Sequence, residues 1–230
     1  MTRRHIAAAG LALVALLATA CGSSSSGANA TLSVSPKAGT LNANGCTTPP
    51  PLQQNHLQFA NEPPLKIKRT TYTARIVTNC GTIIVSMFGG KAPHTVNSFA
   101  FLAGRGYFND TPCHRLTTQG IFVLQCGDPT GTGTGGPGYT LPEENLKGAT
   151  YPAGTVAMAR TQQPHSGGSQ FFLVYANTSL PPQYTPFGRI TAGLSVLQRI
   201  ARAGTDNSNG AGDGHPNQPV VIESFGVTKG

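Results

Sequence analysis

The centre of the chain reads Cys113-His114-Arg115-Leu116 and, a few residues later, Phe122-Val123-Leu124-Gln125-Cys126-Gly127-Asp128. Alternating side chains and a tight return near 118–120 predict two antiparallel strands, at about 113–117 and 121–126. Farther along, Gly168-Ser169-Gln170-Phe171-Phe172 adds a second amide and two aromatic rings to the single guanidinium of the centre. No obvious nucleophile, acid–base pair or metal cluster accompanies them. The combination suits a site that grips a peptide and twists it, and does not suit one that cuts or oxidises it.

The residues on either side of this centre predict a mainly β fold. A hairpin pattern runs through 71–78, turns at Asn79-Cys80-Gly81 and returns through 82–88. Only 10% of the residues are charged, and 29 Gly and 18 Pro favour short strands joined by turns. Further strands are expected at 155–159, 170–175, 185–190 and 220–227, and helices at 95–105 and 194–203. Two helices among about eight strands is the pattern of a closed antiparallel barrel capped at its ends.

The three motifs, in this order and spacing, resemble the cyclophilin family of peptidyl-prolyl cis-trans isomerases. The resemblance spans roughly residues 70 to 229, which is most of the chain. It implies the cyclophilin-like fold, a closed eight-stranded antiparallel barrel capped by two helices. It also implies an enzyme that needs no cofactor and acts on unfolded or proline-containing polypeptides. We expect it to be a monomer.

The isomerase chemistry explains why one arginine stands among apolar residues. Rotation about an X–Pro bond faces a barrier of about 20 kcal/mol, because the amide is partly double-bonded. A catalyst need only stabilise the twisted amide, in which the nitrogen regains its lone pair. Arg115 is the natural hydrogen-bond donor, because its guanidinium stays charged and forms a rigid fork. The resemblance gives the matching arginine this role.

The resemblance assigns the other site residues position by position. Phe122 and Gln125 join Arg115 as catalytic residues. The substrate-binding residues are Val123, Ala159, Arg160, Gly168, Gln170, Phe172, Leu180 and Tyr184. Three positions depart from the family pattern: Val123 replaces the usual Met, Arg160 the usual Asn, and Tyr184 a frequent His. Ser179 stands where cyclosporin-sensitive members carry Trp, and this chain contains no Trp.

Several other features are expected to be structural. Residues 131–136 satisfy the G-x-G-x-x-G pattern, but prolines flank them and no helix is expected to follow, so we interpret them as a loop rather than a dinucleotide site. His114 and His165 are expected to be hydrogen-bonded or surface histidines without a catalytic task. Phe171 should point into the core, away from Phe172. We expect no metal site, and no Cys113–His114 nucleophile, because neighbours on a strand face opposite sides.

The cysteines point to two disulfides. Cys46, Cys80, Cys113 and Cys126 permit three pairings. Cys113 begins one predicted strand and Cys126 ends the next, so antiparallel pairing would bring them opposite each other. Cys46–Cys80 is then the second bridge, which would pin the preceding segment to the domain. Such bridges are typical of oxidising compartments.

The N-terminus predicts export. Residues 1–20 contain Arg3, Arg4 and a short apolar stretch, as in a signal peptide. Small residues followed by Cys21 resemble a bacterial lipidation site, so we expect a lipid anchor at Cys21 on the extracytoplasmic face of the cell membrane. The alternative is simple secretion after residue 20. Residues 21–69, rich in Ser and Pro, are expected to form a flexible tether to the isomerase domain at 70–230.

The charge distribution limits the kinds of partner that the protein can bind. The net charge is +8, but the basic residues are scattered apart from Lys66, Lys68 and Arg69. A nucleic-acid site would need a broader basic face, so we expect no nucleic-acid partner. The sequence therefore predicts an isomerase for exported proteins. The alternative is a proline-peptide binding module or holdase with little turnover, in which a charge at the proline would have no task.

Overall fold

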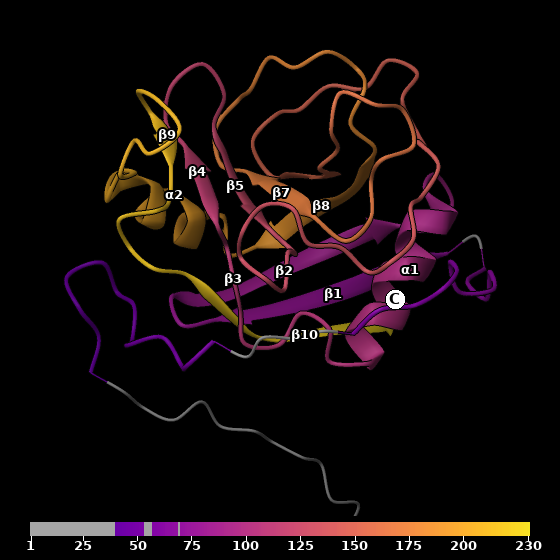
Figure 1. Ribbon diagram of the computed structural model, residues 1–230, viewed down its shortest axis with the longest axis horizontal. Coiled ribbons are helices and arrows are strands. Elements are labelled where there is room, and N and C mark those ends of the chain that lie inside the picture. The colour runs from indigo at the N-terminus through magenta and orange to yellow at the C-terminus, as the bar shows by residue number, and fades with distance from the viewer. Residues whose placement is uncertain (1–39, 53–56, 69) are drawn as a thin grey trace, which may run out of the picture. The chain divides into compact units, whose positions relative to one another are not determined.

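The computed structural model describes residues 40–52, 57–68 and 70–230. Its strands form one curled antiparallel sheet (Figure 1). Its order is β3-β10-β1-β2-β8-β6-β7-β5-β4-β9. The strands are β1 (Thr71–Thr78), β2 (Gly81–Phe88), β3 (Thr111–Pro112), β4 (Arg115–Thr117), β5 (Val123–Cys126), β6 (Thr155–Met158), β7 (Phe171–Val174), β8 (Pro186–Ala192), β9 (Asp213–Gly214) and β10 (Val221–Lys229). The mainly β prediction is confirmed.

The closed eight-stranded barrel is not confirmed. All eight expected strands are present, but β3 and β9 bring the described sheet to ten. These two strands have two residues each, which is too short for any alternation to be recognised in the sequence. Among the described residues they stand at the two ends of the hydrogen-bonded order, so the pairing is that of a half-barrel.

The two expected helices are present. α1 (Pro93–Gly104) starts with proline at its first turn, where a missing N–H costs nothing. Glu144 accepts hydrogen bonds from the main-chain N–H groups of His94 and Thr95, at 3.0 and 2.9 Å, and so satisfies two free donors of that turn. α2 (Leu194–Arg202) buries Leu197 and Ile200. Figure 1 shows α1 and α2 on opposite sides of the view.

An aromatic cluster fills the interior between the sheet and α1. Phe99 of α1 packs against Phe187, with ring centroids 4.6 Å apart, and against Phe108 at 5.3 Å. Phe171 is fully buried in the same cluster. Its inward orientation, predicted from the period of the strand, is confirmed.

Both expected disulfides are present, Cys46–Cys80 and Cys113–Cys126. The first crosses from the N-terminal segment to the turn between β1 and β2. Cys46 is fully buried, and Arg199 donates a hydrogen bond to the carbonyl of Asn44 at 2.7 Å. Thr47 N–H donates to the carbonyl of Asn79 at 2.8 Å. This segment is thereby part of the folded unit.

The folded unit begins before residue 70, where the domain was expected to start. The described parts of the expected tether, 40–52 and 57–68, pack against the domain and belong to the same compact unit. Proline-rich composition suggested free chain, but buried Asn79 and Asn97 bind the segment's main-chain groups. The signal peptide and Cys21 lie outside the described residues. Within the described ranges, neither helix has the length and apolar character that crossing a bilayer requires.

Candidate active site

The site lies on the face of the sheet that points away from the aromatic interior. Along β7, Phe171 and Leu173 join the interior, while Phe172 and Val174 join a second apolar cluster on the opposite face. Val123 of β5 also lies in this second cluster. The period of two in a strand therefore separates a structural face from a binding face in the paired strands β5 and β7.

Arg115, on β4, is fixed by two neighbours. Its Nε and Nη2 groups donate hydrogen bonds to the two carboxylate oxygens of Asp213, at 2.8 and 2.6 Å. Its Nη1 group donates to Oε1 of Gln125 at 3.3 Å, across the register pair Arg115–Gln125 of β4 and β5. A two-point contact of this kind restricts the plane of the guanidinium as well as its position.

The Arg115–Asp213 contact also sets the charges of both groups. Hydrogen bonding to Asp213 raises the pKa of Arg115, and the same contact lowers the pKa of the Asp213 carboxyl. Both groups are therefore ionised across the neutral range. Asp213 was missed in the sequence, because it lies in a two-residue strand within a loop of Gly, Asn and Asp that has no regular period.

A cavity of about 340 Å³ opens beside Arg115. The predicted site residues that line it are Arg115, Val123, Gln125, Ala159, Arg160, Phe172, Leu180 and Tyr184. Val123, Phe172 and Leu180 give it an apolar wall, and Arg115 and Gln125 give it a polar one. Its other lining residues include Ile121, Asn209 and His215, which sequence reasoning did not single out.

Phe122 is not among the residues that line this cavity. It packs toward the interior, with its ring centroid 6.0 Å from that of Tyr175, and Ile121 lines the cavity instead. The physical reason is that the alternation of β5 continues into the two residues before it: Ile121 packs with Val123, whereas Phe122 packs with the interior. Strict use of the period would have found Ile121, whereas matching by motif selected its aromatic neighbour.

A second cavity, of about 660 Å³, adjoins the first, and both are lined by Gln125, Gly133, Ala159 and Arg160. The predicted residues Gly168 and Gln170 line this second cavity and not the first. Gln125 Nε2 donates to Gln170 Oε1 at 2.9 Å, and Gln170 Nε2 donates to the carbonyls of Gly133 and Gly135, each at 2.9 Å. A chain of hydrogen bonds thus links Arg115 to the glycine-rich loop.

Asp128 organises the glycine-rich loop. The Asp128 carboxylate accepts hydrogen bonds from the main-chain N–H groups of Thr130, Gly133 and Gly135, at 2.7, 2.6 and 3.0 Å. These bonds and that from the Thr130 hydroxyl lower its pKa, although burial acts in the opposite direction. Residues 131–136 contain neither helix nor strand, so their interpretation as a loop is confirmed.

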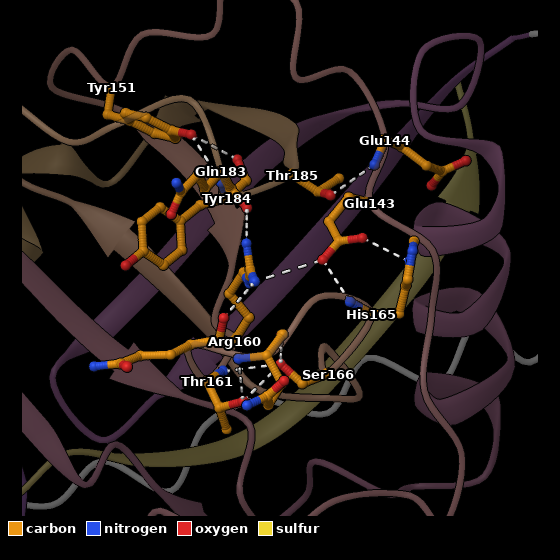
Figure 2. Close-up of polar contacts among 12 residues, drawn as sticks. Glu143, Glu144, Tyr151, Arg160, Thr161, His165, Ser166, Gln183, Tyr184 and Thr185 are labelled. Atoms are coloured by element: carbon orange, nitrogen blue, oxygen red, sulfur yellow. Dashed lines mark hydrogen bonds and ion pairs between the residues drawn. The ribbon is translucent and has the colours of Figure 1, made fainter.

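Arg160 lies where three loops meet, as Figure 2 shows. Its two terminal nitrogens donate to the carbonyls of Gln183 and Gln162, at 3.4 and 3.1 Å, and its Nε lies 3.7 Å from a carboxylate oxygen of Glu143. Two of its N–H groups are therefore used by the protein itself, whereas the buried Nε has no hydrogen-bond partner among the described residues. Arg160 lines both cavities, so its side chain supports their walls. The resemblance implies a main-chain contact with the peptide as well.

Tyr184 forms an aromatic wall of the first cavity. Its ring stands edge-on to that of Phe172, with centroids 5.6 Å apart. The Tyr151 hydroxyl donates to the carbonyl of Tyr184 at 2.8 Å and accepts from its N–H at 3.1 Å (Figure 2). Both main-chain polar groups of Tyr184 are thus hydrogen-bonded, which fixes the position of the backbone that carries its ring.

The two histidines differ. His165 is a surface residue, as expected, with Nδ1 2.6 Å from Glu143. His114 is buried beside the first cavity, and burial lowers its pKa, so it is mainly neutral at neutral pH. Neither of its ring nitrogens has a hydrogen-bond partner among the described residues, so the expectation of a hydrogen-bonded structural histidine is not met for His114. No cluster of three or more potential metal ligands occurs in the described ranges.

Comparison with known proteins agrees with this geometry. The family described as cyclophilin type peptidyl-prolyl cis-trans isomerase matches residues 73–227. A probable peptidyl-prolyl cis-trans isomerase B of Mycobacterium leprae is 48% identical over 169 residues, which cover 67% of this chain and 56% of that protein. Its Mycobacterium tuberculosis counterpart is 44% identical over 183 residues, covering 70% and 58%. This chain therefore matches less than two thirds of the length of these mycobacterial relatives.

Fungal relatives and solved structures extend the comparison. Peptidyl-prolyl cis-trans isomerase-like 1 of Aspergillus fumigatus is 38% identical over 137 residues, covering 57% of this chain and 83% of that protein. A cyclophilin type isomerase of Cryptosporidium parvum matches with a TM-score of 0.60 and 28% identity, over 70% of this chain and 99% of that one. A second structure of it, in the presence of the dipeptide Ala-Pro, gives 0.59 and 29%, over 69% and 99%. With the fold, the site and these similarities in agreement, the chain belongs to the cyclophilin-type peptidyl-prolyl cis-trans isomerase family.

Proposed function

We propose that this protein is a peptidyl-prolyl cis-trans isomerase that accelerates X–Pro rotation in exported proteins, with Arg115 stabilising the twisted amide. The observation that carries the proposal is the guanidinium of Arg115, held by Asp213 and Gln125 beside an apolar cavity. A module that only bound proline would gain little from a cation fixed in this way. The similarity to a structure studied with Ala-Pro supports the same substrate class.

The mechanism follows from what each group can do. Val123, Phe172 and Leu180 would take the pyrrolidine ring out of water, which orients the peptide at low cost. A guanidinium has five N–H groups, and three donate to Asp213 and Gln125, so two remain for the substrate. As the C–N bond twists, the proline nitrogen gains a lone pair, and a hydrogen bond from Arg115 is stronger to the twisted state than to the planar one. That difference lowers the barrier without a covalent step.

The test is an isomerisation assay on the full chain with a tetrapeptide containing one X–Pro bond. We expect faster relaxation from cis to trans than in buffer, in proportion to enzyme concentration. Tight binding of the peptide without acceleration would contradict the proposal and would favour a binding module.

We also propose that the protein works outside the cytoplasm, anchored to the membrane by a lipid on Cys21. Two disulfides in a small domain support an oxidising compartment, and the N-terminal sequence supports export. Cys21→Ser should move the protein from the membrane fraction to the soluble fraction without changing its isomerase activity. Finding the unchanged protein in the soluble fraction would contradict the anchor.

The absence of Trp predicts weak cyclosporin binding. The resemblance places Ser179 where sensitive members carry an indole, and Ser179 is exposed beside a side cavity with Leu180. Losing a buried aromatic contact and its hydrogen bond costs about 2–3 kcal/mol, roughly 30- to 150-fold in affinity. Proline peptides should suffer less, because their apolar wall of Val123, Phe172 and Leu180 is present. Titrating cyclosporin against the isomerase assay tests this, and nanomolar inhibition would contradict it.

A further inference from the structure

Residues 57–68 lie outside the family match, yet they are tied to α1. The side chain of Asn97, buried in α1, donates to the carbonyls of Pro63 and Pro64 at 3.1 and 3.2 Å and accepts from Lys66 N–H at 2.9 Å. Glu62 lies 2.7 Å from Nδ1 of His94, at the start of the same helix. One buried amide thus binds three main-chain groups of the segment, which fixes its path along the helix.

The other end of the segment reaches the glycine-rich loop. The ring of Phe59 stands edge-on to that of Phe101 of α1, with centroids 4.9 Å apart, and Phe59 N–H donates to the carbonyl of Pro137 at 2.8 Å. Gln58 Nε2 donates to the carbonyl of Gly136 at 2.8 Å. Gly138 has φ +93°, and a Cβ there would lie 2.7 Å from the carbonyl oxygen of Phe59, so glycine permits this close approach.

Gln58 therefore lines the second cavity, which adjoins the first cavity, the one beside Arg115 that we call the proline cavity. Much of the remaining lining is apolar, with Pro137, Ala159 and several glycines, but five residues add hydroxyl or amide side chains: Thr134, Thr140, Thr161, Ser166 and Gln170. Gln58 is exposed, and its Oε1 accepts no hydrogen bond from the described residues. A free acceptor on a fixed main chain can bind a substrate N–H or O–H group.

We propose that Gln58 is a specificity-determining residue that contacts the substrate away from the proline and favours an amide or hydroxyl side chain there. The inference rests on the proposed isomerase function and adds to it a substrate contact from a segment that precedes the family domain. Because the two cavities share Gln125 and Ala159, a peptide whose proline occupies the first can continue into the second. A short peptide would not reach Gln58, whereas a longer one would.

The experiment compares the full chain with Gln58→Ala, using a tetrapeptide and a set of Ala-rich decapeptides with a central proline. In the set, a single Gln is moved from position to position. We expect the unchanged protein to favour one position by about fivefold in kcat/KM, the magnitude of one hydrogen bond. Gln58→Ala should lose that preference through KM, because the contact is equal in the planar and twisted states. Its activity on the tetrapeptide should not change.

Asn61→Ala is the matched control, since Asn61 is an exposed amide of the same segment that lines neither cavity. It should keep the preference for that Gln position. Both variants should have the same melting temperature as the unchanged protein. The inference is overturned if Gln58→Ala keeps the preference, or if it loses activity equally on the tetrapeptide. If the unchanged protein fails to accelerate the tetrapeptide, the proposed function fails. Fluorescence anisotropy with the same decapeptides then still decides whether Gln58 binds peptide.

Discussion

Replacing Arg115 by Ala is expected to lower kcat/KM about 100-fold or more, which corresponds to roughly 2.7 kcal/mol of transition-state stabilisation. The loss should appear mainly in kcat, because the hydrogen bond strengthens only as the amide twists. Binding of a proline peptide should weaken much less, because Val123, Phe172 and Leu180 would still enclose the ring. Stopped-flow or protease-coupled isomerisation measures the first quantity, and anisotropy measures the second.

Arg189→Ala is a suitable control, because Arg189 is an exposed arginine of β8 that lines neither cavity. Its removal changes the net charge equally and should leave kcat/KM unchanged. Equal activity of Arg115→Ala and the unchanged protein would contradict the mechanism. A similar loss in both variants would show that net charge matters, rather than one donor at the proline.

Asp213→Asn extends the same experiment to a residue that acts through Arg115. Asn keeps the shape but offers one acceptor oxygen and no charge, so we expect a smaller loss, about tenfold. Because the pKa of Asp213 is lowered in the folded protein, the contact is present at neutral pH and is lost as the pH falls through that lowered value. The unchanged protein should therefore lose kcat/KM only in acid. Asp213→Asn should lack that decline, which a purely structural role would not remove.

Regular alternation explains why so much of the sheet could be predicted. The strand β2 is an example, because Ile83, Val85 and Met87 are buried while the residues between them are partly exposed. Asp213 could not be found in this way. It reaches Arg115 from a loop that is far away in the sequence, and only the pairing of β9 with β4 brings the two together.

Composition misled the prediction at the N-terminal segment. Prolines and polar residues at 40–68 are typical of free chain, and no periodic pattern reveals that Asn79 and Asn97 offer buried hydrogen bonds to it. Cys46 was the one signal, because its predicted partner lay in the hairpin turn. The predicted disulfide therefore indicated that the N-terminal segment packs against the domain, which hydropathy and composition did not indicate.

Removing the Cys113–Cys126 disulfide is expected to lower both stability and activity. The cysteines are 13 residues apart, and loop-closure entropy gives a loss of about 3 kcal/mol for a loop of this length. For a chain of this size, the melting temperature should fall by about 6–12 °C. Cys126 adjoins Gln125, and Cys113 lies just before Arg115, so the bridge also holds the strand pair that carries both site residues. A Cys113→Ala/Cys126→Ala variant should therefore lose kcat/KM several-fold, even well below its melting temperature.

The Cys46–Cys80 disulfide provides the matched comparison. It closes a longer loop, with a separation of 34, so its removal should cost somewhat more stability, about 4 kcal/mol. Neither cysteine lines the proline cavity or adjoins Arg115 or Gln125. A Cys46→Ala/Cys80→Ala variant should thus melt at a lower temperature but keep kcat/KM on a tetrapeptide. Calorimetry and the isomerase assay on both double variants separate the two effects. Equal losses of activity would show that the cross-link near Arg115 has no role in the site beyond general stability.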